Sequence, residues 1–218
     1  MTLAHKDNSP EPNGHTQVVA VTGGICDGKT TVLKMFDEFG AKTLSADSVA
    51  QELLCPGTDL WERVHREFAS ELRVFERGLL ADLIANNPQA RRRLNRLMHP
   101  PIVAAIYKEI EQVRSTSRGI FVVEAPLLIE IGIQGQYDRI LVASAGYTIQ
   151  LERLTQRLGD RDKAALYLQS QLPTSVKRAF ADWIVDTSYP LNVVRSEVLR
   201  IWTELSYTLR VGLIDSSV

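Results

Sequence analysis

The residues best suited to chemistry lie together near the start of the chain. Residues 23–30, Gly-Gly-Ile-Cys-Asp-Gly-Lys-Thr, fit the spacing G-x-x-x-x-G-K-[ST] of a phosphate-binding P-loop. In such a loop backbone N–H groups surround the phosphates of ATP or GTP, Lys29 reaches the β- and γ-phosphate oxygens, and the Thr30 hydroxyl can bind Mg²⁺. The residues that we expect to bind the nucleotide are Gly24, Ile25, Cys26, Asp27, Gly28, Lys29, Thr30 and Thr31.

The segments on either side of this loop are those that a P-loop requires. Residues 17–22 form a short apolar run rich in valine, which predicts a buried strand. Residues 30–39 place Val32, Leu33 and Phe36 at helical spacing, and Gly40 ends the pattern. Strand, glycine-rich loop and helix therefore follow one another in the order that the motif needs.

The remaining apolar pattern predicts an α/β protein. Strands are expected at residues 41–46, 120–124, 140–143 and 183–185, and they alternate with helices. This alternation predicts a three-layer P-loop kinase fold, in which a parallel sheet carries helices on both faces. Helices are expected at residues 48–54, 151–158, 163–172 and 191–207.

A long helical stretch, residues 58–117, separates the second and third expected strands. It is too long for a plain crossover, so we expect an inserted helical subdomain that can hold a second substrate. Thr58 is a candidate N-cap, a helix is expected to open at Pro88, and Pro100 and Pro101 are expected to break the chain before a further helix. The expected organisation is a leader at 1–16, one domain at 17–210 (core 17–57 and 118–210, insertion about 58–117, lid about 151–178) and a tail at 211–218.

Composition narrows the functional classes. The 218 residues carry a net charge of −1, so no overall positive field draws the chain to nucleic acid. No run approaches the length of a membrane span. Residues 1–16 are polar and lack the apolar core of a signal peptide, so we expect a disordered leader. Two cysteines make no disulfide framework and fit a cytoplasmic protein.

Two carboxylates are expected at strand ends, where open α/β sheets bind ligands. Asp47 follows the second expected strand and can accept a proton from an acceptor hydroxyl; alternatively, it caps the next helix. Glu124 ends an apolar strand and can hold Mg²⁺ through water; alternatively, it is a strand-end carboxylate that binds no metal.

Arginines supply the positive charge that a triphosphate needs. Arg153 and Arg157 are one helical turn apart and can reach the triphosphate from a closing lid; alternatively, they form a solvated face paired with Glu152 or Asp160. The run at residues 91–93 reads as a solvated face. A guanine-specifying N-K-x-D motif is absent from the sequence, and a small α/β chain with a helical insertion suits a kinase for a small acceptor.

From about Val18 to Thr187 the sequence resembles the dephospho-coenzyme A kinase family. The P-loop is similar to that family's opening G-G-I-x-x-G-K-[ST], and residues 44–47 are similar to its D-A-D segment, with the second acid at Asp47. Further similar segments are Pro56-Gly57, Arg77 with Leu80, Asn87-Pro88, Leu94-Asn95, Met98-His99-Pro100, residues 124–130, residues 138–142, residues 150–157, Gln171, Lys177 and Ala181-Asp182.

The resemblance implies transfer of the γ-phosphoryl group of ATP, with Mg²⁺, to the ribose 3′-hydroxyl of dephospho-CoA, giving CoA and ADP. It implies catalytic roles for Lys29, Asp47 and Arg157, nucleotide contacts from Arg153 and Arg157, and a metal site at Thr30 and Glu124. The residues expected to bind the acceptor are Asp47, Arg77, His99, Pro126 and Leu127. His99 is alternatively a structural histidine. No nucleic-acid or membrane partner is implied, and we expect a monomer or a small homo-oligomer.

Several positions depart from the family pattern, and three of them are near the expected chemistry. Cys26 and Asp27 stand where the family usually has small residues, and Ser45 replaces the first acid of D-A-D. The Asp27 carboxylate would weaken triphosphate binding unless it points away from the phosphates. Two other classes are therefore open: a divergent module that binds a nucleotide or a CoA-like ligand with little turnover, and a kinase for another small acceptor such as a nucleoside monophosphate.

Overall fold

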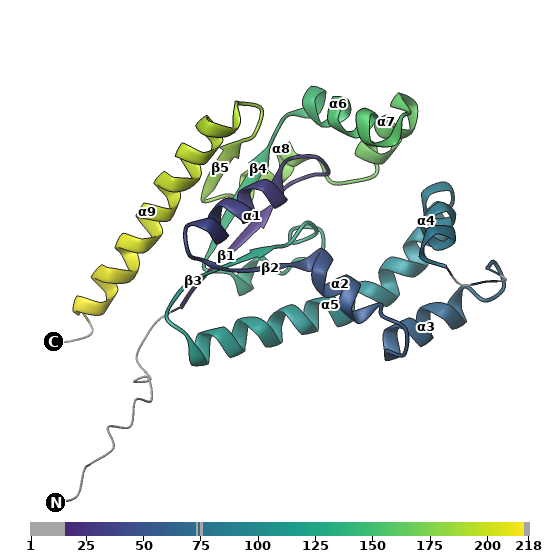
Figure 1. Cartoon of the computed structure of the whole chain (residues 1–218), viewed down its shortest axis with the longest axis horizontal. Helices are drawn as coiled ribbons and strands as arrows, with labels where there is room; N and C mark the ends of the chain where they lie inside the picture. The colour runs from purple at the N-terminus through teal and green to yellow at the C-terminus, as the bar shows by residue number, and fades with distance from the viewer. Residues whose placement is uncertain (1–15, 73, 75, 216–218) are drawn as a thin grey trace, which may run out of the picture. The chain divides into compact units, whose positions relative to one another are not determined.

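The structure, a computed structural model, describes residues 16–72, 74 and 76–215 and contains a parallel sheet (Figure 1). Within those residues five strands lie in the order β2-β3-β1-β4-β5. The central strand β1 pairs in parallel with β3 and β4, and β4 pairs in parallel with β5. The strands are β1 (Thr16–Thr22), β2 (Lys42–Ser45), β3 (Gly119–Glu124), β4 (Arg139–Ser144) and β5 (Trp183–Asp186).

Contacts divide the chain into two compact units, which are described separately. The first unit comprises Met1–Thr43 and Ile110–Val218, and the second comprises Leu44–Glu109. Among the described helices, none combines the length and the apolar character that a membrane crossing needs.

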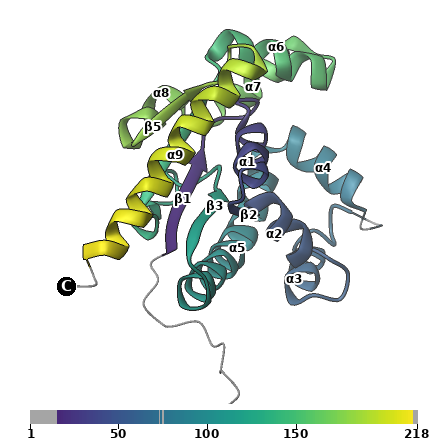
Figure 2. The same ribbon diagram turned by 60° about the vertical axis from the view of Figure 1, so that its left-hand side comes forward.

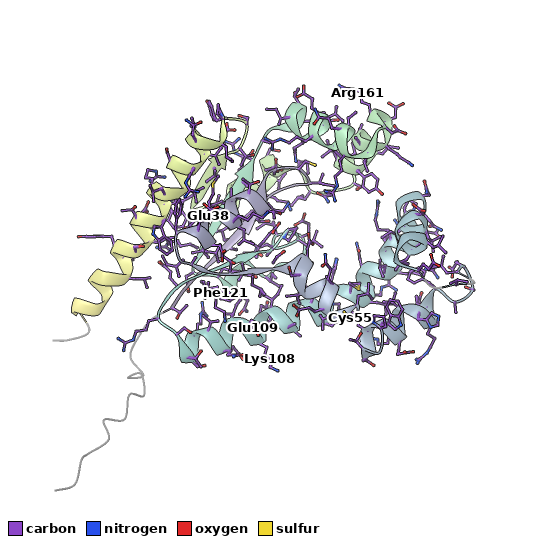
Figure 3. All side chains as sticks on the ribbon, viewed as in Figure 1. Glu38, Cys55, Lys108, Glu109, Phe121 and Arg161 are labelled. Atoms are coloured by element: carbon purple, nitrogen blue, oxygen red, sulfur yellow. The ribbon has the colours of Figure 1, made fainter. Side chains whose placement is uncertain are left out.

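In the first unit, α1 (Lys29–Glu38) and α9 (Leu191–Asp215) lie over one face of the sheet (Figure 2). Every residue of β1 is buried, because neighbouring strands flank it and side chains of both faces are covered. At the end of α1, Glu38 forms an ion pair with Arg195 of α9, and Figure 3 marks this glutamate. The Arg195 guanidinium also lies 4.9 Å from the ring centre of Phe39.

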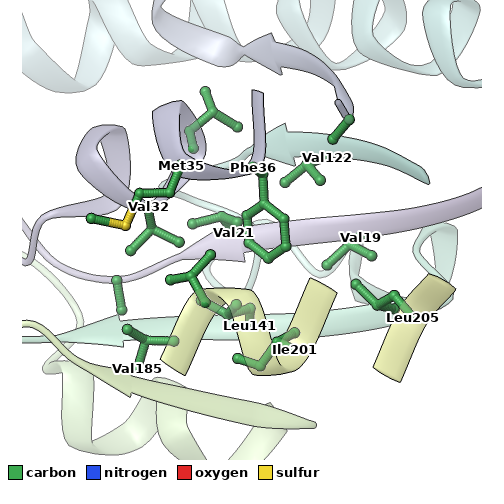
Figure 4. Packing of buried hydrophobic residues seen from close by; sticks show 14 of the residues in the cluster. Val19, Val21, Val32, Met35, Phe36, Val122, Leu141, Val185, Ile201 and Leu205 are labelled. Carbon is green, nitrogen blue, oxygen red and sulfur yellow. The ribbon is translucent and has the colours of Figure 1, made fainter. Parts of the chain in front are cut away.

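The main hydrophobic core lies between this sheet face and the two helices (Figure 4). Strand residues two apart, such as Val19 and Val21, point to the same side and meet the apolar stripe of α1. The fully buried members of this core include Val32, Phe36, Val122, Leu141, Val185, Val198 and Ile201.

Helices that follow β4 carry the region expected to form the lid. They are α6 (Tyr147–Leu158), α7 (Arg161–Gln169) and the four-residue α8 (Thr174–Lys177). Leu151 and Leu154 of α6 and Ala164 of α7 form a small buried cluster, and Ile25 and Cys26 of the P-loop pack against it. Short 3₁₀ turns occur at η1 (Gln134–Gln136) and η2 (Arg178–Phe180).

The second unit has a hydrophobic cluster of its own. It contains α2 (Ala46–Leu53), α3 (Asp59–Glu67), α4 (Arg77–Asn86) and most of α5 (Pro88–Thr116). Thr58 caps α3 as expected, because its hydroxyl accepts a hydrogen bond from the Trp61 N–H at 3.2 Å. The buried members of the cluster are Leu60, Val64, Phe68, Leu80, Ala90 and Leu94.

Two expectations about helix ends were wrong. Pro100 and Pro101 do not break the chain, since both lie inside the 29-residue α5. Each proline removes one helical hydrogen bond, but Leu94 before them and Ile106 after them are buried, and that packing holds the helix through the interruption. The last helix continues through Asp215 instead of ending at Tyr207, so the expected tail begins as helix.

The unit boundaries also differ from the expected ones. Leu53 and Leu54 pack against the cluster of the second unit, which explains why that unit begins at Leu44 and not near residue 58. Thr16 belongs to β1, where its side chain is 2% exposed, and the rest of the expected leader lies outside the described residues. The short helix α8 was not expected from the sequence.

Candidate active site

The P-loop joins the carboxyl end of the central strand β1 to the amino end of α1. Gly28 precedes the helix with φ 79°, a left-handed conformation that glycine adopts without a steric penalty. No side-chain hydrogen bond caps α1, and N–H groups at the start of a helix are oriented for an anion. Cys26 is the one non-glycine residue with positive φ among the described residues, at 60°.

Asp27 is fully buried, and its carboxylate is directed into hydrogen bonds with the protein. Oδ2 accepts from the Gly24 N–H at 2.6 Å, and Oδ1 accepts from the Ala145 N–H at 2.8 Å. The Thr174 hydroxyl donates a third hydrogen bond to Oδ2. The Asp27 carboxylate, which from the sequence alone was expected beside the phosphates, therefore accepts hydrogen bonds from three protein donors.

The first part of the loop is held by side chains that come from beyond it. The Ile25 N–H donates to Oε1 of Gln171 at 3.1 Å, and the Ile25 carbonyl accepts from Nε2 of Gln150 at 2.9 Å. A Cβ on Gly24 would lie 2.6 Å from that same Nε2 and 2.8 Å from the Thr174 hydroxyl, so a larger residue would displace these side chains from their contacts. The N–H groups of Gly24 and Ile25 are thus already bonded to protein atoms.

Lys29 and Thr30 lie at the start of α1. The Lys29 ammonium donates to the Gly24 carbonyl at 2.7 Å, which keeps it next to the loop. The Thr30 hydroxyl donates to Oε1 of Glu124 at 3.2 Å. Glu124 is 3% exposed and ends β3, where its pairing with Val21 places it beside the end of β1.

The oxygen atoms of these two side chains would fit a magnesium ion bound together with a nucleotide. Mg²⁺ prefers oxygen donors and usually keeps several waters and phosphate oxygens besides one or two protein ligands. The Thr30 hydroxyl and the Glu124 carboxylate are adjacent and supply that number. Among the described residues, no group of three or more His, Cys, Asp or Glu side chains could hold a metal by itself.

The two lid arginines have different environments. The Arg153 guanidinium donates to the Cys26 carbonyl at 3.0 Å and to the Thr187 carbonyl at 2.7 Å, so it joins the P-loop to the segment after β5. Arg157 lies in the last turn of α6 and is exposed. Within the described part of the chain, its side chain has no hydrogen bond or ion pair.

Pro126 and Leu127 belong to the loop at residues 125–133, which follows β3. The Ala125 N–H donates to the Val21 carbonyl at 2.9 Å, so this loop leaves the sheet beside the P-loop. The Pro126 carbonyl accepts from the Lys177 ammonium at 2.6 Å. Both Pro126 and Leu127 are partly exposed.

The other expected acceptor residues lie in the second unit. Asp47 is exposed in the first turn of α2, and Ser45, not Asp47, occupies the N-cap position of that helix. Arg77 is the first residue of α4, and His99 is half-buried in α5.

Several residues in contact with the loop had no expected role. Gln150, Gln171, Thr174 and Lys177 bond to the P-loop or to the 125–133 loop. Gln171 and Lys177 fall in segments that resemble the family, but no spacing rule connects Gln171 with Ile25, 146 residues away, or Lys177 with Pro126, 51 residues away. A cavity of about 460 Å³ opens beside Gly24 and is also bounded by Gln150, Gln171 and Thr174.

Four features together define a P-loop kinase. They are a parallel sheet, a P-loop at its central strand, a lysine and a hydroxyl at the start of α1, and a carboxylate at the end of β3. Comparison with known proteins specifies the family. Residues 17–192 match the model of the dephospho-CoA kinase family, and the chain belongs to that family.

Relatives support the same assignment. A dephospho-CoA kinase of Syntrophotalea carbinolica is 35% identical, over 86% of this chain and 92% of that protein, and one of Geobacter metallireducens is 32% identical, over 86% and 96%. The structure is similar to that of TT1252 from Thermus thermophilus, with a TM-score of 0.70 and 25% identity over 88% of this chain and 98% of the other. A dephospho-CoA kinase from Campylobacter jejuni shares the fold, with a TM-score of 0.60 and 24% identity over 87% and 97%.

Proposed function

We propose that this protein transfers the γ-phosphoryl group of ATP to the ribose 3′-hydroxyl of dephospho-CoA and releases CoA and ADP, the last step of coenzyme A biosynthesis. The observation that carries the proposal is the P-loop arrangement of Lys29, Thr30 and Glu124 in a chain that belongs to the dephospho-CoA kinase family. Phosphoryl transfer depends mostly on positioning and on neutralising charge, and these residues supply both.

On the nucleotide side, we infer that Lys29 exchanges its hydrogen bond with the Gly24 carbonyl for the β- and γ-phosphate oxygens. The N–H groups at the start of α1 bind the phosphates. Thr30 and Glu124 would hold Mg²⁺, which when bound neutralises part of the phosphate charge. Arg157, exposed at the end of α6, supplies further positive charge when the lid at about residues 151–178 closes.

Arg153 holds the loop, and we infer that it also contributes positive charge near the phosphates. Its guanidinium is bonded to the carbonyls of Cys26 and Thr187, and those bonds place it next to the P-loop before any nucleotide binds. A fixed guanidinium costs less ordering on binding than a mobile one.

On the acceptor side, Asp47 is the proposed general base. Its carboxylate is exposed, and within the described residues it has no hydrogen bond or ion pair, so it is available to a hydroxyl group. We further propose that Arg77, His99, Pro126 and Leu127 contact dephospho-CoA, with Arg77 suited to its pyrophosphate.

We also propose a cytoplasmic enzyme that works as a monomer or as a small homo-oligomer. Cys26 and Cys55 are both free thiols, which fits a reducing compartment.

The test is the release of ADP from ATP with dephospho-CoA, compared with nucleoside monophosphates as acceptors. We expect turnover with dephospho-CoA and a product that mass spectrometry identifies as CoA. Turnover only with a nucleoside monophosphate would contradict the proposed acceptor. Tight ATP binding without turnover on any acceptor would identify a binding module instead.

A further inference from the structure

The short helix α8 presents two buried polar side chains on one side. Thr174 is 8% exposed and Lys177 is 1% exposed, and residues three apart in a helix lie on the same face. Ser175 and Val176, which lie between them, are exposed. The buried face of α8 is therefore polar and makes specific contacts in place of apolar packing.

The Thr174 end of α8 bonds to the P-loop. Its hydroxyl donates to the Asp27 carboxylate and accepts from the Gly24 N–H at 3.2 Å. The same carboxylate accepts from the N–H groups of Gly24 and Ala145. All three partners of Asp27 are donors, so its two carboxylate oxygens act as the acceptors that join Gly24, Ala145 and Thr174.

The Lys177 end of α8 bonds to the 125–133 loop. Its ammonium lies 2.7 Å from Oε1 of Glu130 and donates to the Pro126 carbonyl at 2.6 Å. A buried ammonium needs such partners, because an uncompensated charge in the protein interior is strongly unfavourable. The loop that carries Pro126 and Leu127 is thereby fixed to α8.

We propose that Asp27, Thr174 and Lys177 are positioning residues for phosphoryl transfer, which act through α8 to link the P-loop to the 125–133 loop. This inference rests on the proposed function, in which the first loop binds ATP and the second binds the acceptor. Both loops take their position from one helical turn at the end of the expected lid segment, so a disturbance at either end of α8 reaches both ligands.

Buried hydrogen bonds are suited to holding a loop in position, because they are satisfied in only a narrow range of distances and angles. A donor that loses its acceptor in the interior costs free energy, so the loop conformation is confined to the one that satisfies Gly24, Ala145 and Thr174. A loop that is ordered in advance binds phosphate with less ordering cost. The acidic residue at position 27 thus serves to hold the loop and does not contact phosphate.

The first experiment removes the hydroxyl or the charge at the P-loop end. Thr174→Val and Asp27→Asn are each expected to weaken ATP binding about tenfold by calorimetry, the effect of one lost hydrogen bond to a charged group. Thr174→Ser keeps the hydroxyl and should restore affinity, and Ser175→Ala, which removes an exposed hydroxyl next to it, should have no effect. The double variant should be no weaker than the worse single variant, because both changes break one contact.

The second experiment tests the link between the two ends. Glu130→Gln keeps the size of the Lys177 partner but removes its charge, and we expect it to weaken ATP binding as well as to raise the KM for dephospho-CoA. Thr174→Val should likewise raise that KM. A purely local role for each contact predicts that each variant affects only its own ligand, and that result would overturn the inference.

The two proposals can fail separately. A wild-type protein that shows no turnover with dephospho-CoA contradicts the proposed function, yet the calorimetric effect of Glu130→Gln on ATP binding still tests the link through α8. An active wild type whose ATP affinity is unchanged in Thr174→Val, Asp27→Asn and Glu130→Gln contradicts the link alone. Thermal unfolding of each variant confirms that the compared proteins are folded.

Discussion

Gly24, Ile25 and Asp27 of the P-loop are bonded to Gln171, Thr174 and other groups outside the loop, whereas Asp47 of the second unit is exposed in the first turn of its helix. The first arrangement fixes the nucleotide site before any ligand arrives. The second leaves the Asp47 carboxylate accessible for its proposed role, in which it meets a hydroxyl group of the acceptor. Charged and polar groups stabilise a transition state best when they need no rearrangement during the reaction. A general base, by contrast, must be accessible to the hydroxyl group whose proton it accepts.

The largest effect is expected where the exposed group is proposed to do chemistry. Asp47→Asn should lower kcat by about 10²–10⁴-fold, the usual contribution of a general base. ATP affinity and thermal stability should stay the same, because the side chain is exposed. Steady-state kinetics, calorimetry and thermal unfolding measure the three quantities. Asp59→Asn, an exposed carboxylate in the first turn of α3, is the matched control. A loss of ATP affinity with preserved turnover would show that the role of Asp47 is wrong.

A large effect on stability is expected at Lys177, a buried ammonium of the first unit. Lys177→Met removes its ion pair with the more exposed Glu130 and its hydrogen bond to the Pro126 carbonyl, and this loss should lower the free energy of unfolding by about 1.5–3 kcal/mol. Urea unfolding measures this loss. The control is Arg63→Met in the second unit, where an exposed pair with Asp59 at 3.8 Å should contribute less than about 1 kcal/mol. Equal losses at the two sites would remove the contrast between the units.

A smaller effect should reveal the backbone strain of the P-loop. Cys26 has φ 60°, so Cys26→Gly should be more stable than Cys26→Ala by about 1 kcal/mol, the cost of a Cβ in the left-handed region. Chemical denaturation of the two variants gives this difference directly. The same pair of substitutions at Lys108, exposed in the interior of α5, should have the opposite order, because glycine is less stable than alanine inside a helix. An alanine variant that matches or exceeds glycine at position 26 would show that the loop is relaxed.

The smallest effect concerns the surface of the second unit. Hydrogen bonds from the Ser70 hydroxyl, and next from Arg93, lower the pKa of Glu71. A lowered pKa means that this carboxylate stabilises the fold at neutral pH and that its contribution is lost as the pH falls through that pKa. Glu71→Gln should therefore be slightly less stable than wild type at neutral pH, and the difference should vanish in acid. Urea midpoints at both pH values measure this, and a difference independent of pH would contradict it.

Local patterns in the sequence were sufficient for most of the fold. The run at residues 17–22 and the helical spacing after Lys29 predicted β1 and α1, and both are confirmed. Thr58 was identified as a cap because its role depends only on neighbours in the sequence. The confirmed order of strands and helices is likewise the sum of such local signals.

Long-range polar contacts could not be predicted in this way. Asp27 and Thr174 are 147 residues apart, and nothing in the spacing of either residue points to the other. The orientation of the Asp27 carboxylate follows from the loop geometry and from α8, a helix too short for a periodic signal. Pro100 and Pro101 show the opposite failure. Proline disfavours a helix interior, so a break was predicted, but tertiary packing keeps α5 continuous through both residues.

The central position of β1 has a consequence for how the molecule opens. All seven residues of this strand are buried between β3 and β4, and its last residue leads directly into the P-loop. Amide protons of such a strand exchange with deuterium only when the whole unit unfolds, while outer helices exchange through partial openings. Partial unfolding of the outer helices thus leaves β1, and with it the start of the P-loop, in place. The P-loop loses this support only when the whole unit unfolds.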